Sequence, residues 1–270
     1  MTKSAEKLPI SAFLVTCNEA AHIASVLDAL QDFAEIILVD SGSTDGTQEI
    51  ARAKGAKVVH QDWLGFAKQK NFAMSLCQYD WVINVDGDEI LSSEVITHIR
   101  KLYEQSEDIA MRLYFEDVFW GEPMSPYSGK RSIVRVFRRS LAQYPLDRKV
   151  HENLVLAKGV STVKVQGLVT HFGYGTTELL MQKKNKYSSL KALEKFEKRK
   201  RPSLIKLCFI FPLTFVKSYV LQRMFLSGKR GLVHAHIEAM YAFLKEAKLF
   251  EYQQLAGKQH ADALQRGRLK

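Results

Sequence analysis

The sequence predicts an α/β fold, in which a mostly parallel sheet with covering helices is followed by a helical C-terminal region. Over residues 10–86, short apolar runs alternate with amphipathic helical patterns. Strands separated by such helices form βαβ units, and these units build parallel sheets that are covered on both faces. From Thr177 onward only helical patterns remain.

The elements of the first half follow one another at regular spacing. Strands are predicted at 10–16, 35–39, 56–60 and 81–85, with helices at about 23–30, 44–54 and 65–77 between them. Polar clusters end three of the strands, at 16–19, 40–43 and 86–88. Ligands of open α/β sheets bind beyond the carboxyl ends of the strands, so we expect the site there.

The second half changes character twice. A mixed β region follows the first half, with strands predicted at 110–119, 133–137, 154–156 and 163–165. The helices that come next are predicted to be divided by Pro202, by Pro212 and by a break near residue 228. These patterns predict an α/β domain over 8–175, with halves 8–95 and 96–175, and a helical region over 176–262.

Composition narrows the class of protein. The chain has 270 residues, of which 46% are hydrophobic, so it can bury a sizeable core and is not a disordered protein. Its three cysteines are widely spaced and form neither a disulfide framework nor a CxxC metal pair, which favours a reducing compartment. The first ten residues lack the apolar core of a signal peptide, and we therefore expect a cytoplasmic protein.

The positive charge is concentrated in one segment. The net charge is +10, and residues 181–201 carry nine Lys/Arg against two Glu, a balance of +7. Such a segment needs an anionic partner or a well-solvated surface, and the candidates are nucleic acid, anionic lipid or a phosphorylated substrate.

The pair Asp86-Gly87-Asp88 is the sharpest chemical feature of the sequence. Two carboxylates one residue apart, at the end of an apolar strand, can hold Mg²⁺ or Mn²⁺ through oxygen ligands. Such an ion would neutralise a diphosphate and stabilise it as a leaving group. The alternative is a turn with two solvated acids, and the preceding βαβαβ pattern favours the metal site.

The other two strand ends supply further candidates. Asp40 can accept hydrogen bonds from a base or ribose, or it can simply cap helix 44–54, where Asp45 and Gln48 have the spacing of a capping box. Glu19 is either an acid in the first turn of a helix or a nucleoside contact. The same cluster holds Thr16 and Asn18, and Lys70, followed by Asn71, can face phosphates unless it is merely an exposed helix lysine.

Taken together, these motifs resemble the family 2 glycosyltransferases with the GT-A fold. The matching stretches are residues 11–19, 37–47, 65–71 and 86–89, which cover most of 8–95. The resemblance implies a nucleotide-diphosphate-sugar donor and an inverting mechanism without a glycosyl-enzyme intermediate. It also implies that residues 8–95 are the nucleotide-sugar-binding half of the domain and that residues 96–175 are the acceptor-binding half. It also implies that Asp40 lies near the base, Asp86 near the ribose or sugar, and Asp88 on the metal.

A looser resemblance to one branch, the bacterial lipopolysaccharide core glucosyltransferases, covers most of residues 110–251. Its matching stretches are 134–139, 150–152, 171–174, 185–188 and 241–251. It implies transfer of a hexose, glucose from UDP-glucose in the first instance, to an inner-core heptose. An acceptor that is another glycolipid or surface polysaccharide is the alternative.

Inverting transfer needs a general base near the acceptor hydroxyl. Two acidic sites compete, Glu152 after His151 and the pair Glu116-Asp117, and we favour Glu152 because alternation along the strand turns one of the pair toward solvent. His171 is a candidate third metal ligand or a structural hydrogen-bonding residue. Arg135 is a candidate for a diphosphate or an anionic acceptor, whereas Arg138 falls on the opposite face of the strand.

The helical region suggests a membrane surface. The apolar run 207–216 has only ten residues and is too short to cross a bilayer, whereas Val233, Ile237, Met240, Leu244 and Ala247 recur at helical spacing. This helix either packs on the catalytic domain or attaches, with the basic segment, to the inner face of the cytoplasmic membrane.

Two other classes of protein explain less. A nucleic-acid-binding protein could use the basic helix, but that reading gives no role to the three aspartates, so we expect no nucleic-acid partner. A Rossmann oxidoreductase would need a glycine-rich first βα turn, which this sequence does not have.

Overall fold

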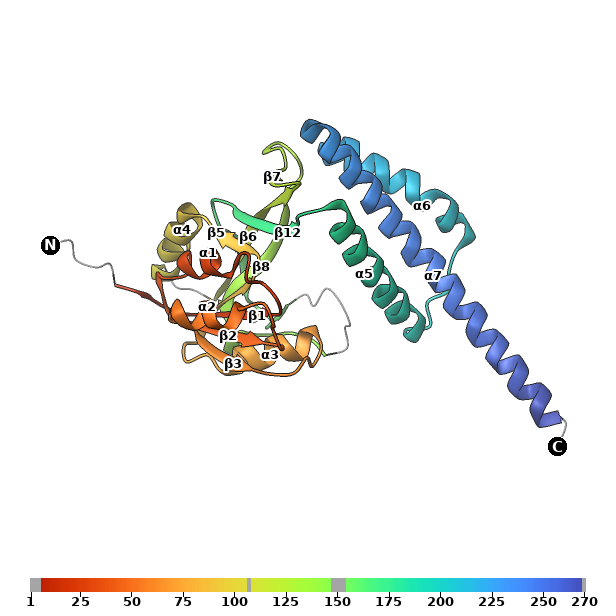
Figure 1. The fold of residues 1–270 in the computed structure, drawn as a ribbon, viewed down its shortest axis with the longest axis horizontal. Coiled ribbons are helices and arrows are strands. Elements are labelled where there is room, and N and C mark those ends of the chain that lie inside the picture. Colours follow the sequence, from red (N-terminus) through yellow and green to blue (C-terminus); the bar gives the residue numbers. More distant parts are fainter. Residues whose placement is uncertain (1–5, 106–107, 147–153, 269–270) are drawn as a thin grey trace. The chain divides into compact units, whose positions relative to one another are not determined.

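The computed structural model describes residues 6–105, 108–146 and 154–268, with side chains as far as residue 256. These residues form two compact units (Figure 1). The first comprises the chain up to Val118 together with Lys130–Gly173, and the second comprises Phe119–Gly129 and everything from Tyr174 onward. The segment Phe119–Gly129 thus belongs with the helices. The assignment of 8–95 to the donor and 96–175 to the acceptor stays a prediction.

The first unit contains the α/β fold. Its helices are α1 (Ile23–Asp28), α2 (Thr47–Ala53), α3 (Phe66–Ser75) and α4 (Ser93–Glu104). Its strands are β1 (Leu8–Thr16), β2 (Phe33–Asp40), β3 (Lys57–His60), β4 (Trp81–Asp86), β5 (Glu89–Leu91), β6 (Ile109–Phe119), β8 (Arg131–Arg138), β9 (Ala142–Gln143), β10 (Val155–Leu156), β11 (Ser161–Lys164) and β12 (Val169–Tyr174), the last residues of β6 and β12 reaching into the second unit.

One sheet organises the described part of this unit: its strands follow the order β3-β2-β1-β4-β8-β6-β12-β5, and β11 pairs with β6 beside this path. The first four strands are parallel, whereas β8 pairs antiparallel with both β4 and β6. The mixed β region therefore continues the parallel sheet directly through β8. The parallel register places Thr16 opposite Asp40, and Val15 opposite Asp86, so the three polar strand ends lie at one edge.

Residues of β1 alternate between two cores, one on each face of the sheet. Ile10, Ala12 and Leu14 pack with apolar residues of α1, α2 and α4, whereas Phe13 packs with residues of α3. This two-residue period is what a strand covered on both faces requires. The fold class is the one predicted, a mostly parallel sheet with covering helices.

Several local predictions were wrong. The helix predicted at 44–54 begins only at Thr47, because the preceding residues form a loop held by hydrogen bonds. The proposed capping box is not formed: Asp45 accepts hydrogen bonds from Thr47 and the Ala20 amide, while Gln48 donates to Asp40. The elements β5 and α4 were not anticipated, and His171 lies inside strand β12, which continues to Tyr174.

The second unit consists of helices together with the short strand β7 (Glu122–Pro123). Its helices are α5 (Thr177–Glu197), α6 (Leu204–Val216), a π turn at Lys217–Leu221, a 3₁₀ turn at Met224–Ser227 and α7 (Gly228–Arg268). Pro212 lies inside α6 and does not divide it, contrary to the prediction.

The apolar run is also longer than its sequence suggests. Because the π turn extends α6, the helical stretch Leu204–Leu221 has 18 residues with a mean hydropathy of 1.7. By length and composition alone it could cross a membrane, so the prediction that it is too short was wrong. One such helix is weak evidence of a span, and its orientation has to be argued from its contacts.

Candidate active site

Asp40 organises the loop between β2 and α2. Its carboxylate is fully buried and accepts hydrogen bonds from the amides of Gly42 and Ser43, at 3.0 and 2.8 Å, from the Ser43 hydroxyl, and from Gln48 at 2.7 Å. Burial opposes ionisation, but these hydrogen bonds outweigh it and hold the pKa of Asp40 below its usual value. The carboxylate therefore shapes the loop, and its contact with a base stays a prediction.

The strand end of β1 is linked to the same loop. Asn18 adopts a left-handed conformation with φ of 58°, and its side-chain oxygen accepts from the Thr44 amide at 2.9 Å. The Glu19 amide donates to Thr47 Oγ1 at 2.9 Å, and Thr16 Oγ1 approaches Asp40 at 3.4 Å. The fold thus brings together four residues that were predicted to contact the nucleotide-sugar donor: Thr16, Asn18, Glu19 and Asp40.

Gly87 joins this group to the carboxylate pair. A Cβ at position 87 would lie 2.8 Å from Cγ of Glu19 and 3.0 Å from Cγ2 of Thr16. Only glycine lets the turn between Asp86 and Asp88 approach the end of β1 so closely. The donor candidates and the two aspartates therefore form one continuous site.

Asp86 ends β4 inside a network of charges. Arg135 Nη2 contacts Asp86 Oδ2 at 2.7 Å and Glu89 Oε1 at 2.6 Å, and Arg135 Nη1 donates to Asn84 at 2.6 Å. Lys70 Nζ lies 3.5 Å from the other oxygen, Oδ1, of Asp86. The predicted donor contacts Lys70, Asp86 and Arg135 are therefore neighbours, and Arg135 is buried and engaged with carboxylates.

These contacts set the charges of the network. Burial opposes ionisation of Asp86, but Arg135 and Lys70 outweigh it and hold the pKa of Asp86 far below its usual range. Burial dominates at Glu89 and raises its pKa. Asp86 is therefore a fixed anion, and its side chain keeps 37% exposure through which a ligand can reach it.

The side chains of His171 and Asp88 face each other where β12 pairs with β5. The backbone positions them, because His171 pairs with Glu89 where β12 meets β5 and the Phe172 amide donates to the Asp88 carbonyl at 2.9 Å. The distance from His171 Nε2 to Asp88 Oδ2 is 3.6 Å, and His171 Nδ1 lies 2.7 Å from Asp117 Oδ1. Asp117 thus fixes the ring so that Nε2 points at Asp88.

The oxygen of Asp88 and the ring nitrogen of His171 suit a divalent cation. A carboxylate behind a ligand histidine is the usual second contact of a metal-bound imidazole. Gly173 leaves the space beside the pair open, since a Cβ there would lie 2.4 Å from the His171 ring and 3.2 Å from Asp88 Oδ2. Among the described residues, no group of three or more His, Cys, Asp or Glu could hold a metal. Asp88 and His171 would thus provide two ligands, and donor diphosphate oxygens and water the others.

Of the two candidate sites for the general base, the structure describes only Glu116-Asp117. Glu152, with His151, lies outside the described residues, so its role stays a prediction. Glu116 pairs with Lys130 at 3.1 Å, and Asp117 pairs with both His171 and Arg131, the latter at 3.2 Å. Both side chains are only 20% exposed, so the expectation that one simply faces solvent was wrong.

Sequence reasoning missed several residues of the site. Asn84 is a polar residue inside the otherwise apolar strand β4, and that contrast was an available signal. Glu89 follows the aspartate pair directly and was not given a role. The Tyr144 hydroxyl donates to Asn84 at 3.3 Å, and the Tyr144 backbone forms two hydrogen bonds with the side-chain amide of Asn71. No local pattern marks Tyr144.

Comparison with known proteins finds a family model and relatives that match this chain. Residues 11–151 match the family model for glycosyl transferase family 2. The lipopolysaccharide core biosynthesis glycosyltransferase LpsC of Rhizobium meliloti is 33% identical, over 95% of this chain and 97% of its own length. An uncharacterized glycosyltransferase of Rickettsia felis is 34% identical, over 90% and 89%.

Solved structures are similar to this chain at lower sequence identity. S. aureus TarS 1–349, in complex with UDP-GlcNAc, has 15% identity and a TM-score of 0.49, covering 92% of each chain. The family assignment therefore rests on the sequence matches, of which LpsC extends over nearly the whole chain. The chain belongs to glycosyl transferase family 2.

Proposed function

We propose that this enzyme transfers a hexose from a UDP-sugar, glucose from UDP-glucose in the first instance, to a heptose of the lipopolysaccharide inner core. The relative LpsC, by its name a glycosyltransferase of lipopolysaccharide core biosynthesis, supports the acceptor class. Another glycolipid or surface polysaccharide is the alternative acceptor. Within the described residues, no nucleic-acid reading motif accompanies the basic helix α5, and a nucleic-acid partner is not proposed.

One observation carries the donor assignment: Asp88 Oδ2 and His171 Nε2 face each other at 3.6 Å beside an open space, next to the fixed anion Asp86. A bound Mg²⁺ or Mn²⁺ would neutralise the diphosphate leaving group. Lys70, at the rim, adds a positive charge on the same side. The loop of Asp40, Asn18 and Glu19 offers the adjacent surface for the nucleoside.

The proposed reaction is a single displacement. The acceptor hydroxyl oxygen forms a bond to the anomeric carbon while the bond from that carbon to the UDP oxygen breaks, and the hydroxyl proton passes to the general base. Glu152 is our candidate for that base. Asp117 is already committed to His171 and Arg131, which favours a role in positioning.

A donor screen with the purified protein tests the proposal. We expect release of UDP from UDP-glucose that requires Mn²⁺ or Mg²⁺ and is stopped by chelator, whereas other nucleotide sugars react slowly. With a heptose-containing acceptor, NMR of the product should show an anomeric configuration opposite to that of the donor. Retention of configuration, or turnover unaffected by chelator, contradicts the mechanism.

We also propose that the enzyme is peripheral on the inner face of the cytoplasmic membrane, where a lipid-linked acceptor is accessible. The balance of +7 over residues 181–201 supports this, since basic residues near an anionic surface contribute about 1 kcal/mol each. Part of that charge is neutralised internally: Lys184 pairs with Glu238, and Lys195 with Glu246. The adjoining Arg199, Lys200 and Arg201 form no ion pair among the described residues.

A further inference from the structure

Helix α6 exposes an apolar stripe along its whole length. Ile205, Phe209 and Leu213 are 75%, 59% and 64% exposed, and Val216 and Val220 continue the stripe at 49% and 50%. These residues recur every three or four positions and thus share one face of the helix. Only 6% of the stretch Leu204–Leu221 is buried, so the described residues of the second unit leave this face uncovered.

The opposite face of α6 is fixed to α7. Phe211 and Phe215 pack on His236, with ring centroids 6.4 and 4.6 Å apart. At the other end, Glu246 of α7 accepts from the Ser203 amide at 2.9 Å and pairs with Lys206 at 2.9 Å. The two helices therefore run antiparallel, side by side, over most of α6.

Apolar side chains continue the surface beyond the C-terminal end of α6. Leu221, Phe225 and Leu226 are 73%, 45% and 46% exposed, and Tyr127 is 75% exposed. The loop that carries Tyr127 is tied to the same place, because the Gly129 amide donates to the Gln222 carbonyl at 2.7 Å. An exposed tyrosine at the edge of an apolar surface is typical of a membrane interface.

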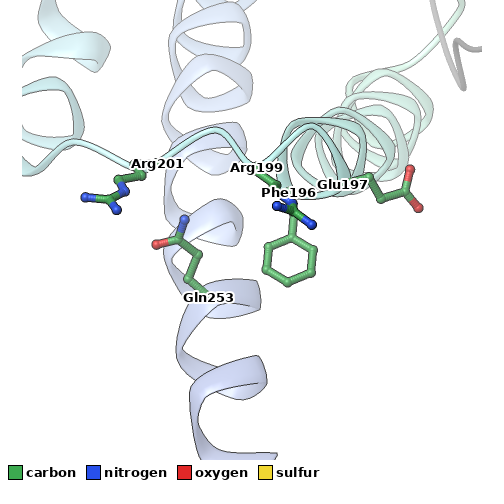
Figure 2. A pocket seen from close by; sticks show the side chains of 5 residues that line it. All are labelled: Phe196, Glu197, Arg199, Arg201 and Gln253. Atoms are coloured by element: carbon green, nitrogen blue, oxygen red, sulfur yellow. The ribbon is translucent and has the colours of Figure 1, made fainter. Parts of the chain in front are cut away.

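The chain segment that carries this surface has charged side chains of one sign only. Residues 198–230 contain nine Lys/Arg and no Asp or Glu. At the N-terminal end of α6, Arg199 and Arg201 line a pocket of about 450 Å³ together with Phe196, Glu197 and Gln253. In Figure 2, the carboxylate of Glu197 points away from Arg201 and Gln253. The apolar stripe is thus bordered by cations that suit anionic headgroups.

We infer that α6 is the membrane-contacting element of the enzyme and lies in the plane of an anionic bilayer surface, with its stripe among the acyl chains. This inference deepens the peripheral attachment proposed above and rests on it. The alternative, a span, conflicts with the contacts of α6. If α6 crossed the bilayer, the side of α7 that carries Glu238, Lys245 and Glu246 would have to enter the hydrocarbon, where charged side chains are costly.

Flotation with liposomes tests the stripe. We expect the full-length protein to bind vesicles that contain phosphatidylglycerol and to bind pure phosphatidylcholine weakly. The triple variant Ile205→Gln, Phe209→Gln, Leu213→Gln should lose roughly 100-fold or more in partitioning, because three large apolar side chains no longer leave water. The matched control is Leu255→Gln, which removes an apolar side chain 49% exposed on α7 and should bind normally.

Depth measurements separate an in-plane helix from a span. Cys208 on α6 is exposed and accepts an environment-sensitive fluorophore once Cys17 has been replaced by serine. Labels at 208, 213 and 220 should be quenched most strongly by nitroxides at one shallow depth in the leaflet. A label at 213 that lies near the bilayer centre, with the labels at 208 and 220 at shallower depths, would show a span and overturn the inference.

Two further outcomes would also overturn it. If the wild-type protein is a dimer without lipid, and the stripe variant is a monomer, the stripe binds a second copy of this chain. If the stripe variant floats like the wild type, another surface makes the contact. UDP-glucose hydrolysis in solution is measured in parallel: its absence in the wild type counts against the proposed function, whereas loss of flotation alone does not.

Discussion

Asp117 holds the ring of His171, and this contact connects two residues that the chain places 54 positions apart. Arg135 likewise contacts Asn84, Asp86 and Glu89 from β8, a strand that is distant in sequence and adjacent to β4 in the sheet. At the scale of single residues, the site therefore consists of a few side chains that would touch the donor and others that fix their direction.

Asp88→Ala should abolish most metal-supported donor binding. One histidine cannot replace the lost carboxylate oxygen, so calorimetry of UDP with Mn²⁺ should show a loss of affinity while UDP alone binds as before. Asp62→Ala, which removes a side chain 92% exposed, is the control and should titrate normally. Wild-type affinity in Asp88→Ala would exclude Asp88 as a ligand.

Asp117→Asn separates a positioning role from a catalytic one. If Asp117 orients His171, the variant should need about 10–100-fold more Mn²⁺ and should recover turnover when Mn²⁺ saturates. Glu152→Gln should instead lose about 10²–10⁴-fold in turnover at any metal concentration, with UDP binding unchanged. A dead Asp117→Asn beside an active Glu152→Gln would reverse the assignment of the base.

At the scale of elements, β12 is the strand that completes the site. It places His171 and Gly173 on the same face, two residues apart, against the turn that carries Asp88. The loops at the ends of β1 and β2 are fixed by their own hydrogen bonds, so the proposed donor surface and the proposed metal ligands are held in place by separate contacts.

Gly173→Ala should displace His171 without unfolding the sheet. The new methyl would lie 2.4 Å from the imidazole, so the ring must move and metal-dependent UDP binding should fall. Gly175→Ala is the matched control, because a Cβ there meets nothing within 4 Å. Circular dichroism should be unchanged in both variants, and equal metal affinities would show that the ring position does not matter.

In α7, the buried charge of Lys245 lowers the stability of the fold, whereas the contacts of Lys248 raise it. Burial, then the charge of Lys195, lowers the pKa of Lys245 to about 8. Because the unfolded chain binds the Lys245 proton more tightly, the charged lysine destabilises the fold most below pH 8. This destabilisation disappears as the pH rises toward 10.5. Lys245→Met should therefore stabilise the fold at pH 7, by roughly 1–2 kcal/mol after screening, and the gain should shrink above pH 8.

Thermal unfolding across pH 7–10 measures this effect. Lys248→Met is the comparison, since Lys248 donates to Asn185, Ser188 and Ser189 of α5 at 2.6–3.0 Å. Its loss leaves those contacts unmade and should destabilise the protein at every pH. If both variants changed the stability at pH 7 in the same direction, the opposite roles of Lys245 and Lys248 would be contradicted.

The sequence predicts elements better than it predicts contacts. Apolar runs gave the strands of the parallel half within two residues at each end, because strand formation there follows local burial. Pro212 was misjudged, because packing of α6 on α7 overrides the local preference of proline. The partners of Arg135 and His171 depend on the order of strands in the sheet, which no local pattern encodes.

At the scale of the whole molecule, each unit has its own task in our proposal. The first carries the donor site, and the second carries the basic and apolar surface. Changing Lys198, Arg199, Lys200 and Arg201 to Gln should weaken binding to anionic vesicles and leave UDP binding intact. Asp88→Ala should do the reverse. A basic-run variant that floats normally and fails to bind UDP would assign these residues to the donor site.

The place of β12 in the sheet also has a consequence for biosynthesis. Strand β5 directly follows Asp88, lies at the end of the strand order and pairs with β12. The first residue of β12, Val169, comes 80 residues after the first residue of β5, Glu89. At translation rates of about 5–20 residues per second, the ribosome needs roughly 4–16 s to make that interval. During this time Asp88 exists without its histidine. The nascent chain thus gains the Asp88–His171 pair only as α5 begins to follow. In our proposal, this order delays donor binding until the unit that would contact the membrane is being made.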